Sequence, residues 1–392
     1  MRRGPLLAAL FLAALTLRPQ LVGVGPLLPA IKDDLDVTHA VAGLLGTIPV
    51  LCMGLFAPPA PFLSGRAGSR RAVGAAVLVV GVFGVARALV PGAWAVVLLT
   101  IPVGVGMGLA GAMLPVAVKE RFADRPGFGT GVYTAGMTVG SAVAAAAAVP
   151  LAHLGNGWRT PLLGFSAASI ALGALWFVLT RAEPSHVRVE SRPLRLPIRN
   201  PLAWRLVAAF FLMSSVFYGL NSWLPDIYVE RGWSESHAGA LLAVMNTLTI
   251  PCGFAVAWAA DHWWERRTWL AGAAALQLAA LAGVLVFPGA GWLWAVILGI
   301  AIGPLFPLTM TLPLDASDQP AEVASLAGMM LGVGYTLSAV SPLLLGAIRD
   351  VTGGFTGVLW TLIGVAALLV AVDASVSPAR LARRELAGQG ST

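Results

Sequence analysis

An arginine lies in the middle of the first long apolar stretch of the chain, in the sequence Leu17-Arg18-Pro19-Gln20. Insertion scales assign a helix-centre arginine a cost of roughly 2.5 to 3.5 kcal/mol, so intramembrane charges usually face a cavity or a partner. Pro19 removes a backbone donor and disfavours the right-handed helical conformation at Arg18, so we expect a kink where the guanidinium leaves the helix. The planar guanidinium fork suits carboxylate-like and nitro-like groups, which makes Arg18 a candidate anion-binding residue.

No carboxylate is expected at the depth of Arg18, because all eighteen acidic residues fall in predicted loops or near predicted helix ends. A buried unpaired charge is costly. Its natural counter-ion would therefore be a transported anion or the electron-rich part of a polar substrate. A topological accident or a salt-bridged structural role is the alternative for Arg18.

The composition is that of an integral membrane protein, since 58% of the 392 residues are hydrophobic and only 11% are charged. At about 20 apolar residues per crossing, we predict an all-α fold of twelve transmembrane helices. Their approximate ranges are about 5–31, 40–62, 72–90, 94–118, 127–152, 159–180, 202–227, 236–260, 268–287, 291–313, 322–348 and 356–377.

The net charge of +7 could suggest a nucleic-acid partner, but the basic residues gather in short loops on one side of the predicted spans. The positive-inside rule then places both termini in the cytoplasm. Five basic residues are left outside: Lys32, Arg87, Arg159, Arg231 and Arg349. We expect a monomeric multi-pass protein of the cytoplasmic membrane that contacts lipid and no nucleic acid. A cleaved signal peptide is the alternative for the N-terminus, although apolarity continues to Ile31.

An internal repeat divides the chain, because residues 29–71 align without gaps on residues 225–267 at an offset of 196 residues. Matched positions include Pro29 with Pro225 and Arg70 with Arg266. Two six-helix bundles in parallel orientation follow from such a repeat. We expect the bundles at 1–180 and 202–379, a cytoplasmic linker at 181–201 and a cytoplasmic tail at 380–392.

The loop after the second predicted span, residues 63–71 with the sequence LSGRAGSRR, resembles the D-R-x-G-R-R pattern of the major facilitator superfamily. Gly65 stands where that family usually has Asp, whereas Asp261 occupies the equivalent place in the second half. In the superfamily this loop gates the cytoplasmic side. The resemblance therefore implies gating roles for Arg66, Arg70, Asp261 and Arg266.

Further segments resemble the cyanate permease and nitroimidazole transporter (CynX/NimT) branch of that superfamily. They are Leu17-Arg18-Pro19 with residues 24–29, the GVYTAGM run at 131–137, Tyr218 with WLP at 223–225, and Gly334-Tyr335 with Pro342. The resemblance covers nearly the whole chain and implies cyanate-like, nitrate-like or nitroimidazole-like substrates.

Aromatic, amide and thioether side chains in other spans are candidates to line a cavity with Arg18, the alternative being hydrogen bonding between helices. They are Tyr218, Asn221, Asn246, Tyr335, Tyr133 and Met137. The repeat maps Arg18 onto Ser214, so the second half supplies no matching arginine. A single positive site favours a small monovalent anion or a neutral polar molecule. Gln20, two residues beyond Arg18, points to a different side of the helix and is left outside the site.

No enzyme, cofactor or metal site is indicated. The run GMGLAG at 106–111 fits the dinucleotide fingerprint but lies inside a predicted span without a βαβ context, where small residues serve helix packing. The five histidines have no metal-ligand spacing, and Cys52 and Cys252 lie in separate spans.

We therefore predict a secondary transporter that moves a small anionic or polar solute by alternating access, with Arg18 anchoring the substrate. A multidrug exporter of the same superfamily is one alternative, and a non-transporting membrane receptor is another. Any proton coupling is expected to use peripheral groups such as Asp226 or Asp315, or the substrate itself, because no titratable residue is expected at the depth of Arg18. Uniport and exchange are equally open.

Overall fold

The computed structural model describes residues 3–57, 68–122, 126–181, 196–260, 263, 265–317 and 320–375, and the regular elements in these ranges are all helical. The first bundle contains α1 (Arg3–Leu15), α2 (Pro19–Val22), η1 (Gly25–Leu27), α3 (Leu28–Leu35), α4 (His39–Phe56), α6 (Ser69–Leu89), α7 (Ala93–Arg121), α8 (Pro126–His153) and α9 (Arg159–Leu179). The second contains α10 (Pro201–Glu230), α11 (Glu235–Ala260), α12 (Arg266–Val286), η2 (Pro288–Ala290), α13 (Gly291–Ala316), α14 (Pro320–Ser338), α15 (Val340–Thr352) and α16 (Thr356–Ser375).

Twelve candidate membrane spans occur in the described residues, which confirms the predicted all-α membrane fold. Ten of the spans hold one long helix each, whereas the first is built from α1, α2, η1 and α3 and the eleventh from α14 and α15. An even number of crossings puts the two ends of the helical region on the same side of the membrane. Large apolar side chains such as Trp94, Leu98 and Trp360 are exposed on the flanks, as expected of a surface that faces lipid.

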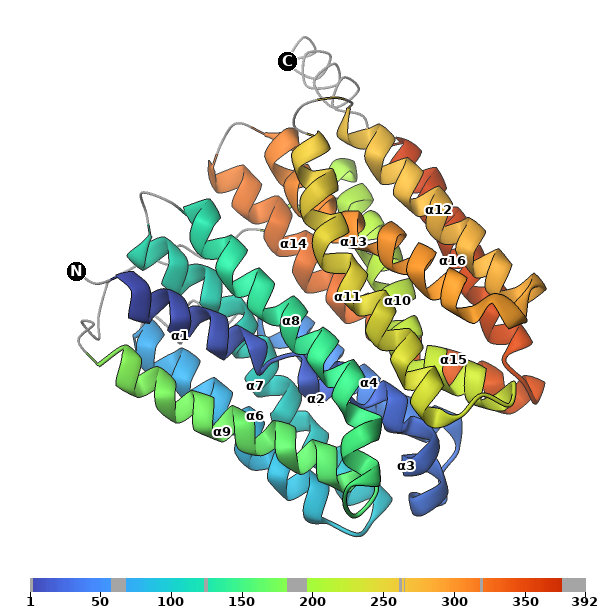
Figure 1. The fold of residues 1–392 in the computed structure, drawn as a ribbon. Helices are drawn as coiled ribbons and strands as arrows, with labels where there is room; N and C mark the ends of the chain where they lie inside the picture. Colours follow the sequence, from blue (N-terminus) through green and yellow to red (C-terminus); the bar gives the residue numbers. More distant parts are fainter. Residues whose placement is uncertain are drawn as a thin grey trace.

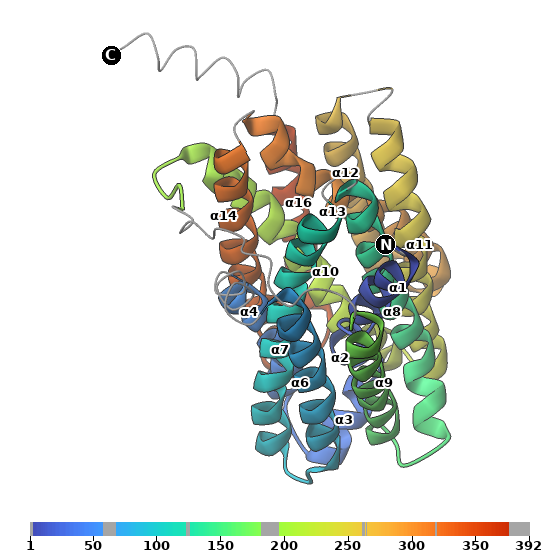
Figure 2. The same cartoon turned by 90° about the vertical axis from the view of Figure 1, so that its left-hand side faces the viewer.

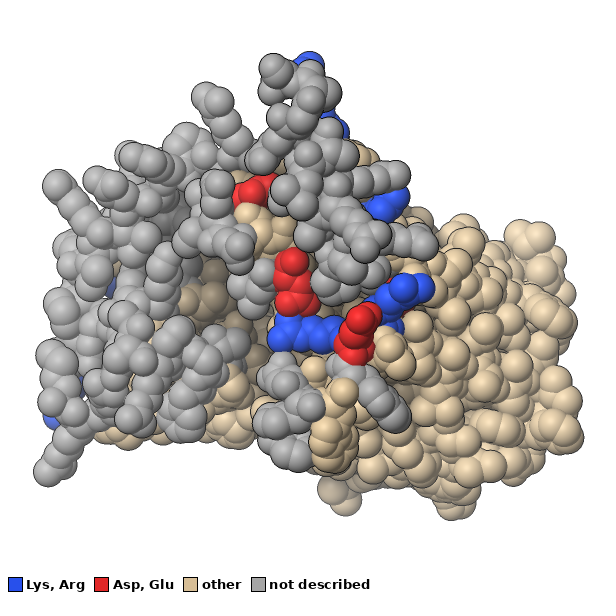
Figure 3. All heavy atoms as spheres, turned by 90° about the horizontal axis from the view of Figure 1, so that it is seen from above, with Lys and Arg blue, Asp and Glu red and all other residues tan. Residues whose placement is uncertain are grey.

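The two bundles lie side by side, with the blue-to-green helices α1–α9 on one side and the yellow-green-to-red helices α10–α16 on the other (Figure 1). A view turned by 90° shows α6, α7 and α9 of the first bundle nearest the viewer, with helices of the second bundle behind them (Figure 2). Seen from above, acidic and basic side chains meet near the middle of the face that carries the C-terminus, while the adjoining flank is tan (Figure 3).

The second span of each bundle begins in the same way, at positions separated by the repeat offset. The Thr38 hydroxyl accepts a hydrogen bond from the backbone N–H of Val41 at 3.3 Å, at the start of α4. The Ser234 hydroxyl accepts one from the backbone N–H of His237 at 3.3 Å, at the start of α11. Both side chains satisfy a backbone donor that the first helical turn leaves free.

The hydrophobic cores of the two bundles are separate at one end of the molecule and merged at the other. Near the termini, one cluster holds first-bundle residues such as Leu10 and Leu114, and another holds second-bundle residues such as Phe210 and Leu326. At the far end a single cluster contains residues of both bundles. Close approach there requires glycine, since a Cβ on Gly25 would lie 1.8 Å from the carbonyl oxygen of Asn221. The bundles are therefore joined firmly at the end away from the termini.

Candidate functional site

The first span breaks at the predicted arginine. Helix α1 ends at Leu15 and α2 begins at Pro19, so the expected kink is present. The expectation that Pro19 would push Arg18 out of the right-handed helical region is wrong, because Arg18 has φ −87° and ψ −31°. Pro19 stands at the first position of α2, where a missing N–H costs little, so the chain bends while its dihedrals stay helical.

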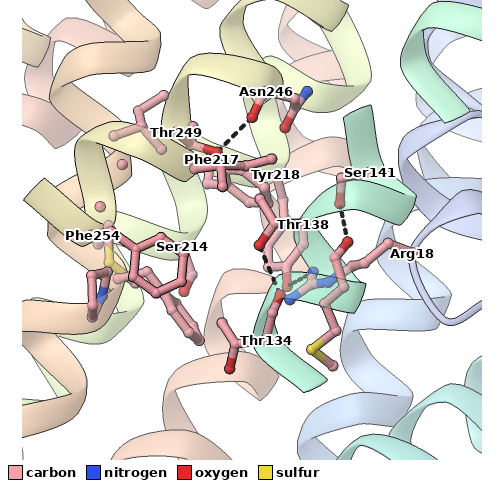
Figure 4. Close-up of a pocket in the computed structure, with 18 of the residues that line it drawn as sticks. Arg18, Thr134, Thr138, Ser141, Ser214, Phe217, Tyr218, Asn246, Thr249 and Phe254 are labelled. Carbon is pink, nitrogen blue, oxygen red and sulfur yellow. Dashed lines mark hydrogen bonds between the residues drawn. The ribbon is translucent and has the colours of Figure 1, made fainter. Parts of the chain in front are cut away.

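A cavity of about 360 Å³ lies between the two bundles at the level of this break. Its lining residues come from both bundles and include Arg18, Thr134, Met137, Thr138, Ser141, Met213, Ser214, Phe217, Tyr218, Asn246, Thr249, Ile250, Phe254, Ile302, Phe306 and Tyr335. Figure 4 shows Arg18 and the hydroxyl-bearing residues of α8 on one side, and Ser214 and Phe254 on the other. The cavity has the size and the mixed lining of a small-molecule site.

Arg18 is tied to the opposite bundle through a neutral partner. Its Nη1 donates a hydrogen bond to the Tyr218 hydroxyl at 3.0 Å, across a sequence separation of 200 residues (Figure 4). Tyr335 also interacts with both groups, and its ring lies 6.4 Å from the Tyr218 ring between centroids. Within the described residues, the groups that interact with the Arg18 guanidinium are these two tyrosines and no carboxylate. The positive charge thus faces the cavity uncompensated.

The apolar side chains of the lining come mostly from the second bundle, whereas polar side chains come from both bundles. The first bundle contributes Arg18 and a row of α8 residues with hydroxyl groups: Thr134, Thr138 and Ser141. The second bundle contributes most of the apolar wall: Met213, Phe217, Ile250, Phe254, Ile302 and Phe306. The second bundle also contributes polar residues: Ser214, Tyr218, Asn246, Thr249 and Tyr335. A bound solute therefore meets a cationic and hydroxylic wall on one side and a mainly aromatic and aliphatic wall with some polar groups on the other.

Five of the seven predicted site residues line the cavity: Arg18, Tyr218, Asn246, Tyr335 and Met137. Asn221 does not, because it lies behind the wall, where its Oδ1 accepts a hydrogen bond from Asn246 Nδ2 at 3.0 Å. Tyr133 is also outside the lining and packs against the core of the first bundle. Its neighbours in the sequence turn toward the cavity instead.

Four α8 residues that line the cavity were not predicted as site residues, although their spacing indicates a common helix face. Gly131, Thr134, Thr138 and Ser141 follow the spacing i, i+3, i+7 and i+10, which places them on one face of a helix. Small and hydroxylic residues on one stripe of an apolar span indicate a cavity or a helix contact. Ser214, the repeat partner of Arg18, also lines the cavity.

A second arginine, Arg87, is buried inside the first bundle. Arg87 is only 1% exposed. Its Nη2 donates to Gln20 Oε1 at 2.7 Å, and its Nη1 donates to the Thr100 hydroxyl at 3.4 Å. Gln20 in turn donates through Nε2 to the Ser166 hydroxyl at 2.9 Å. Gln20 therefore points away from the cavity and supports Arg87.

Charged residues connect the bundles at the end away from the termini. We name Lys32, His39, Asp226 and Asp350 the outer cluster. Lys32 and His39 of the first bundle approach Asp226 of the second at 3.5 and 3.6 Å. Asp350 accepts hydrogen bonds from the backbone N–H groups of His39 and Ala40 at 3.1 and 2.8 Å. Because these donors are the first backbone N–H groups of α4, a carboxylate of one bundle caps a helix of the other. Asp350 also contacts His39 Nδ1 at 2.7 Å.

Two of the residues expected to gate the opposite end, Arg70 and Arg266, make contacts inside their own bundles. Arg70 donates to the Phe177 carbonyl oxygen at 2.8 Å and to the Thr180 hydroxyl at 3.1 Å, which ties α6 to α9. Arg266 forms an ion pair with Asp315 between α12 and α13. Arg66 and Asp261 lie outside the described residues. Asp315, named for proton coupling, is thus engaged by an arginine.

Comparison with known proteins gives consistent matches over most of the chain. A profile of the Major Facilitator Superfamily matches residues 6–339. The cyanate transport protein CynX of Escherichia coli (strain K12) is 32% identical over 352 residues, covering 89% of this chain and 91% of that protein. The 2-nitroimidazole transporter of the same organism is 30% identical over 369 residues, covering 94% and 93%. The resemblance drawn from the sequence motifs is confirmed.

Solved structures show the same fold. A bacterial homolog of the human lysosomal transporter Spinster, in an inward-facing and occupied conformation, has a TM-score of 0.77 at 18% identity. The match covers 97% of each chain. The likeness at this low identity concerns the arrangement of the helices alone.

Proposed function

The chain belongs to the Major Facilitator Superfamily, and on that premise we propose that it carries a small anionic or polar solute across the cytoplasmic membrane, with Arg18 as the anchor. It is a multi-pass membrane transporter, as its family and its relatives are. The relatives that transport cyanate and 2-nitroimidazole support an electron-rich substrate for this chain as well. The termini are proposed to lie in the cytoplasm.

The observation that carries the proposal is the unneutralised guanidinium in a cavity between the bundles. Arg18 stays charged at any physiological pH and presents several N–H donors in one plane. Its partners among the described residues are the hydroxyls of Tyr218 and Tyr335, which leave the charge for a ligand to neutralise. Burial removes water from the Arg18 guanidinium, and the tyrosines replace only some of the lost hydrogen bonds. A substrate that accepts hydrogen bonds from Arg18 would replace the others.

Alternating access is supported by the unequal ends of the molecule. The bundles share a core and the outer cluster at the end away from the termini, but have separate cores near the termini. A transport cycle would separate Lys32 and His39 from Asp226 and Asp350 and close the opposite end in exchange. The cavity would then be reached from the other side of the membrane.

The test combines ligand binding with transport by the purified full-length chain. Thermal shifts with small anions, nitroaromatics and neutral analogues identify a ligand, and flux into proteoliposomes shows whether it is carried. Arg18→Ala should abolish both while the protein remains folded. Arg18→Lys should recover part of the binding, because it restores the charge without the planar fork.

Three outcomes would oppose the proposal. Saturable binding without flux would favour a receptor. Preferential binding of cationic or neutral drugs would favour a multidrug exporter. If Arg18→Ala binds anions as tightly as the unmodified protein, Arg18 does not anchor the substrate.

A further inference from the structure

The cavity is large for an inorganic anion. An ion of three or four atoms takes up roughly the volume of one or two water molecules, ~30 to 60 Å³. The cavity offers about 360 Å³. Bound alone at Arg18, such an ion would leave most of an apolar-walled space to be filled by water. The volume therefore fits a solute with an apolar body.

The apolar wall suits a flat ring. Phe217, Phe254 and Phe306 line the cavity from three different helices, α10, α11 and α13. Aromatic pairs in offset or edge-to-face geometry gain about 0.5–1.5 kcal/mol beyond the burial of area. Met213 also lines this wall, and thioether sulfur makes favourable contacts with ring edges.

The cavity offers both a hydrogen-bond donor and hydrogen-bond acceptors to a ligand. The Thr138 hydroxyl donates to the Thr134 carbonyl oxygen at 2.9 Å, and the Ser141 hydroxyl donates to the Met137 carbonyl oxygen at 3.1 Å. The Thr249 hydroxyl likewise donates to the Asn246 carbonyl oxygen at 2.6 Å. With their hydrogens engaged, these oxygens are available as acceptors, whereas Arg18 is only a donor. The lining thus calls for a ligand with an anionic end and an O–H or N–H donor elsewhere.

From these three features, and resting on the proposed function, we infer that the substrate is an aromatic monoanion: a planar ring with one carboxylate for Arg18 and a ring hydroxyl or N–H for the α8 hydroxyls. Arg18 is the one cationic side chain among the described residues that line the cavity, so a second carboxylate would be left without a counter-charge. Cyanate and nitrate would bind as weaker ligands at the same guanidinium.

The experiment compares monoanions by thermal shift and calorimetry on the full-length protein at pH 7.5. The probes are 3-hydroxybenzoate, benzoate, cyclohexanecarboxylate, acetate and cyanate. We expect 3-hydroxybenzoate to bind about tenfold more tightly than cyclohexanecarboxylate, which has the same charge without a flat ring. Acetate and cyanate should bind more weakly than cyclohexanecarboxylate.

Substitutions assign the selectivity to the walls. Phe306→Leu should weaken benzoate about tenfold and leave cyanate binding unchanged. Thr138→Val should remove the preference for 3-hydroxybenzoate over benzoate. Phe211→Leu is the matched control, since Phe211 packs against the second-bundle core outside the cavity and should alter neither affinity.

The outcomes separate this inference from the proposed function. If acetate or cyanate binds as tightly as the benzoates and still requires Arg18, the aromatic substrate is wrong and the anion transporter stands. The same holds if Phe306→Leu changes all affinities equally. If no anion binds in an Arg18-dependent way, both proposals fail.

Discussion

Two arginines of the first bundle are withdrawn from bulk solvent, and their surroundings differ. Arg87 is 1% exposed, and its hydrogen-bond partners, Gln20 and Thr100, belong to its own bundle. Arg18 is half-buried, lines a cavity and reaches Tyr218 of the other bundle. Neither forms an ion pair with a carboxylate of the described residues.

The difference teaches that burial of a charge does not by itself indicate a binding site. Arg87 is enclosed by packed side chains and meets an amide oxygen and a hydroxyl that are fixed in place. Arg18 borders a cavity, and its partner Tyr218 belongs to the bundle that the proposed transport cycle would move relative to it. What distinguishes Arg18, the proposed anchor, is the cavity beside it and a hydrogen-bond partner that belongs to the other bundle.

The largest expected effect is on folding, from removing the support of Arg87. Gln20→Leu deletes the amide oxygen at 2.7 Å and leaves a buried guanidinium with two contacts at 3.4 Å. Stranding a buried charge costs about 3 kcal/mol or more. We expect the midpoint of thermal unfolding in detergent to fall by roughly 5 to 10 °C.

A double substitution checks the cause of that loss. Gln20→Leu combined with Arg87→Met removes the stranded charge together with its partner and should recover much of the stability, as a double-mutant cycle would show. If the double variant is less stable than Gln20→Leu alone, packing and not the charge explains the effect.

The sequence predicted the environment of Arg18 better than that of Arg87. Apolar stretches of sufficient length predicted the spans, and Pro19 predicted the break at Arg18, because both depend on local composition. The burial of Arg87 was hidden, since Gln20 is 67 positions away and the pairing depends on how α2 packs against α6. The environment of Arg87 is set by tertiary packing, which the local sequence does not specify.

The site was predictable in so far as it follows helical periodicity. Thr134, Thr138 and Ser141 share a face of α8 that could have been read from their spacing, and Tyr133 could have been excluded by the same count. The sequence could not show that Asn246 lines the cavity while Asn221 lies behind the wall. That difference depends on the rotation of α10 and α11 about their axes.

A second effect, on binding, should leave folding almost untouched. Arg18→Met removes a charge that borders a cavity, so the unfolding midpoint should change by less than about 3 °C, while the affinity for an anionic ligand should fall about 100-fold. Ligand-dependent thermal shift measures both quantities in one series. A loss of stability as large as that of Gln20→Leu would make Arg18 a structural residue like Arg87.

A smaller effect is expected from the partner of Arg18. Tyr218→Phe removes the hydroxyl that accepts the 3.0 Å hydrogen bond but keeps the ring in the wall. The guanidinium loses an orienting contact worth about 1 kcal/mol, which corresponds to an affinity loss of roughly fivefold. Titration calorimetry against the same ligand tests this, with Tyr228→Phe as control, because Tyr228 is buried away from the cavity. Tighter binding by Tyr218→Phe would mean that the tyrosine competes with the substrate for Arg18.

The smallest expected effect is that of pH on binding. Among the described residues that line the cavity there is no Asp, Glu or His, and a guanidinium keeps its proton throughout the physiological range. His39, Asp226 and Asp350 belong to the outer cluster and do not line the cavity. For a ligand that stays ionised between pH 6 and 8, the dissociation constant should therefore vary by less than about twofold. A steeper change that disappears in His39→Gln would mean that the outer cluster communicates with Arg18. If the steep change of the dissociation constant with pH persists in His39→Gln, another titrating group must lie at the cavity.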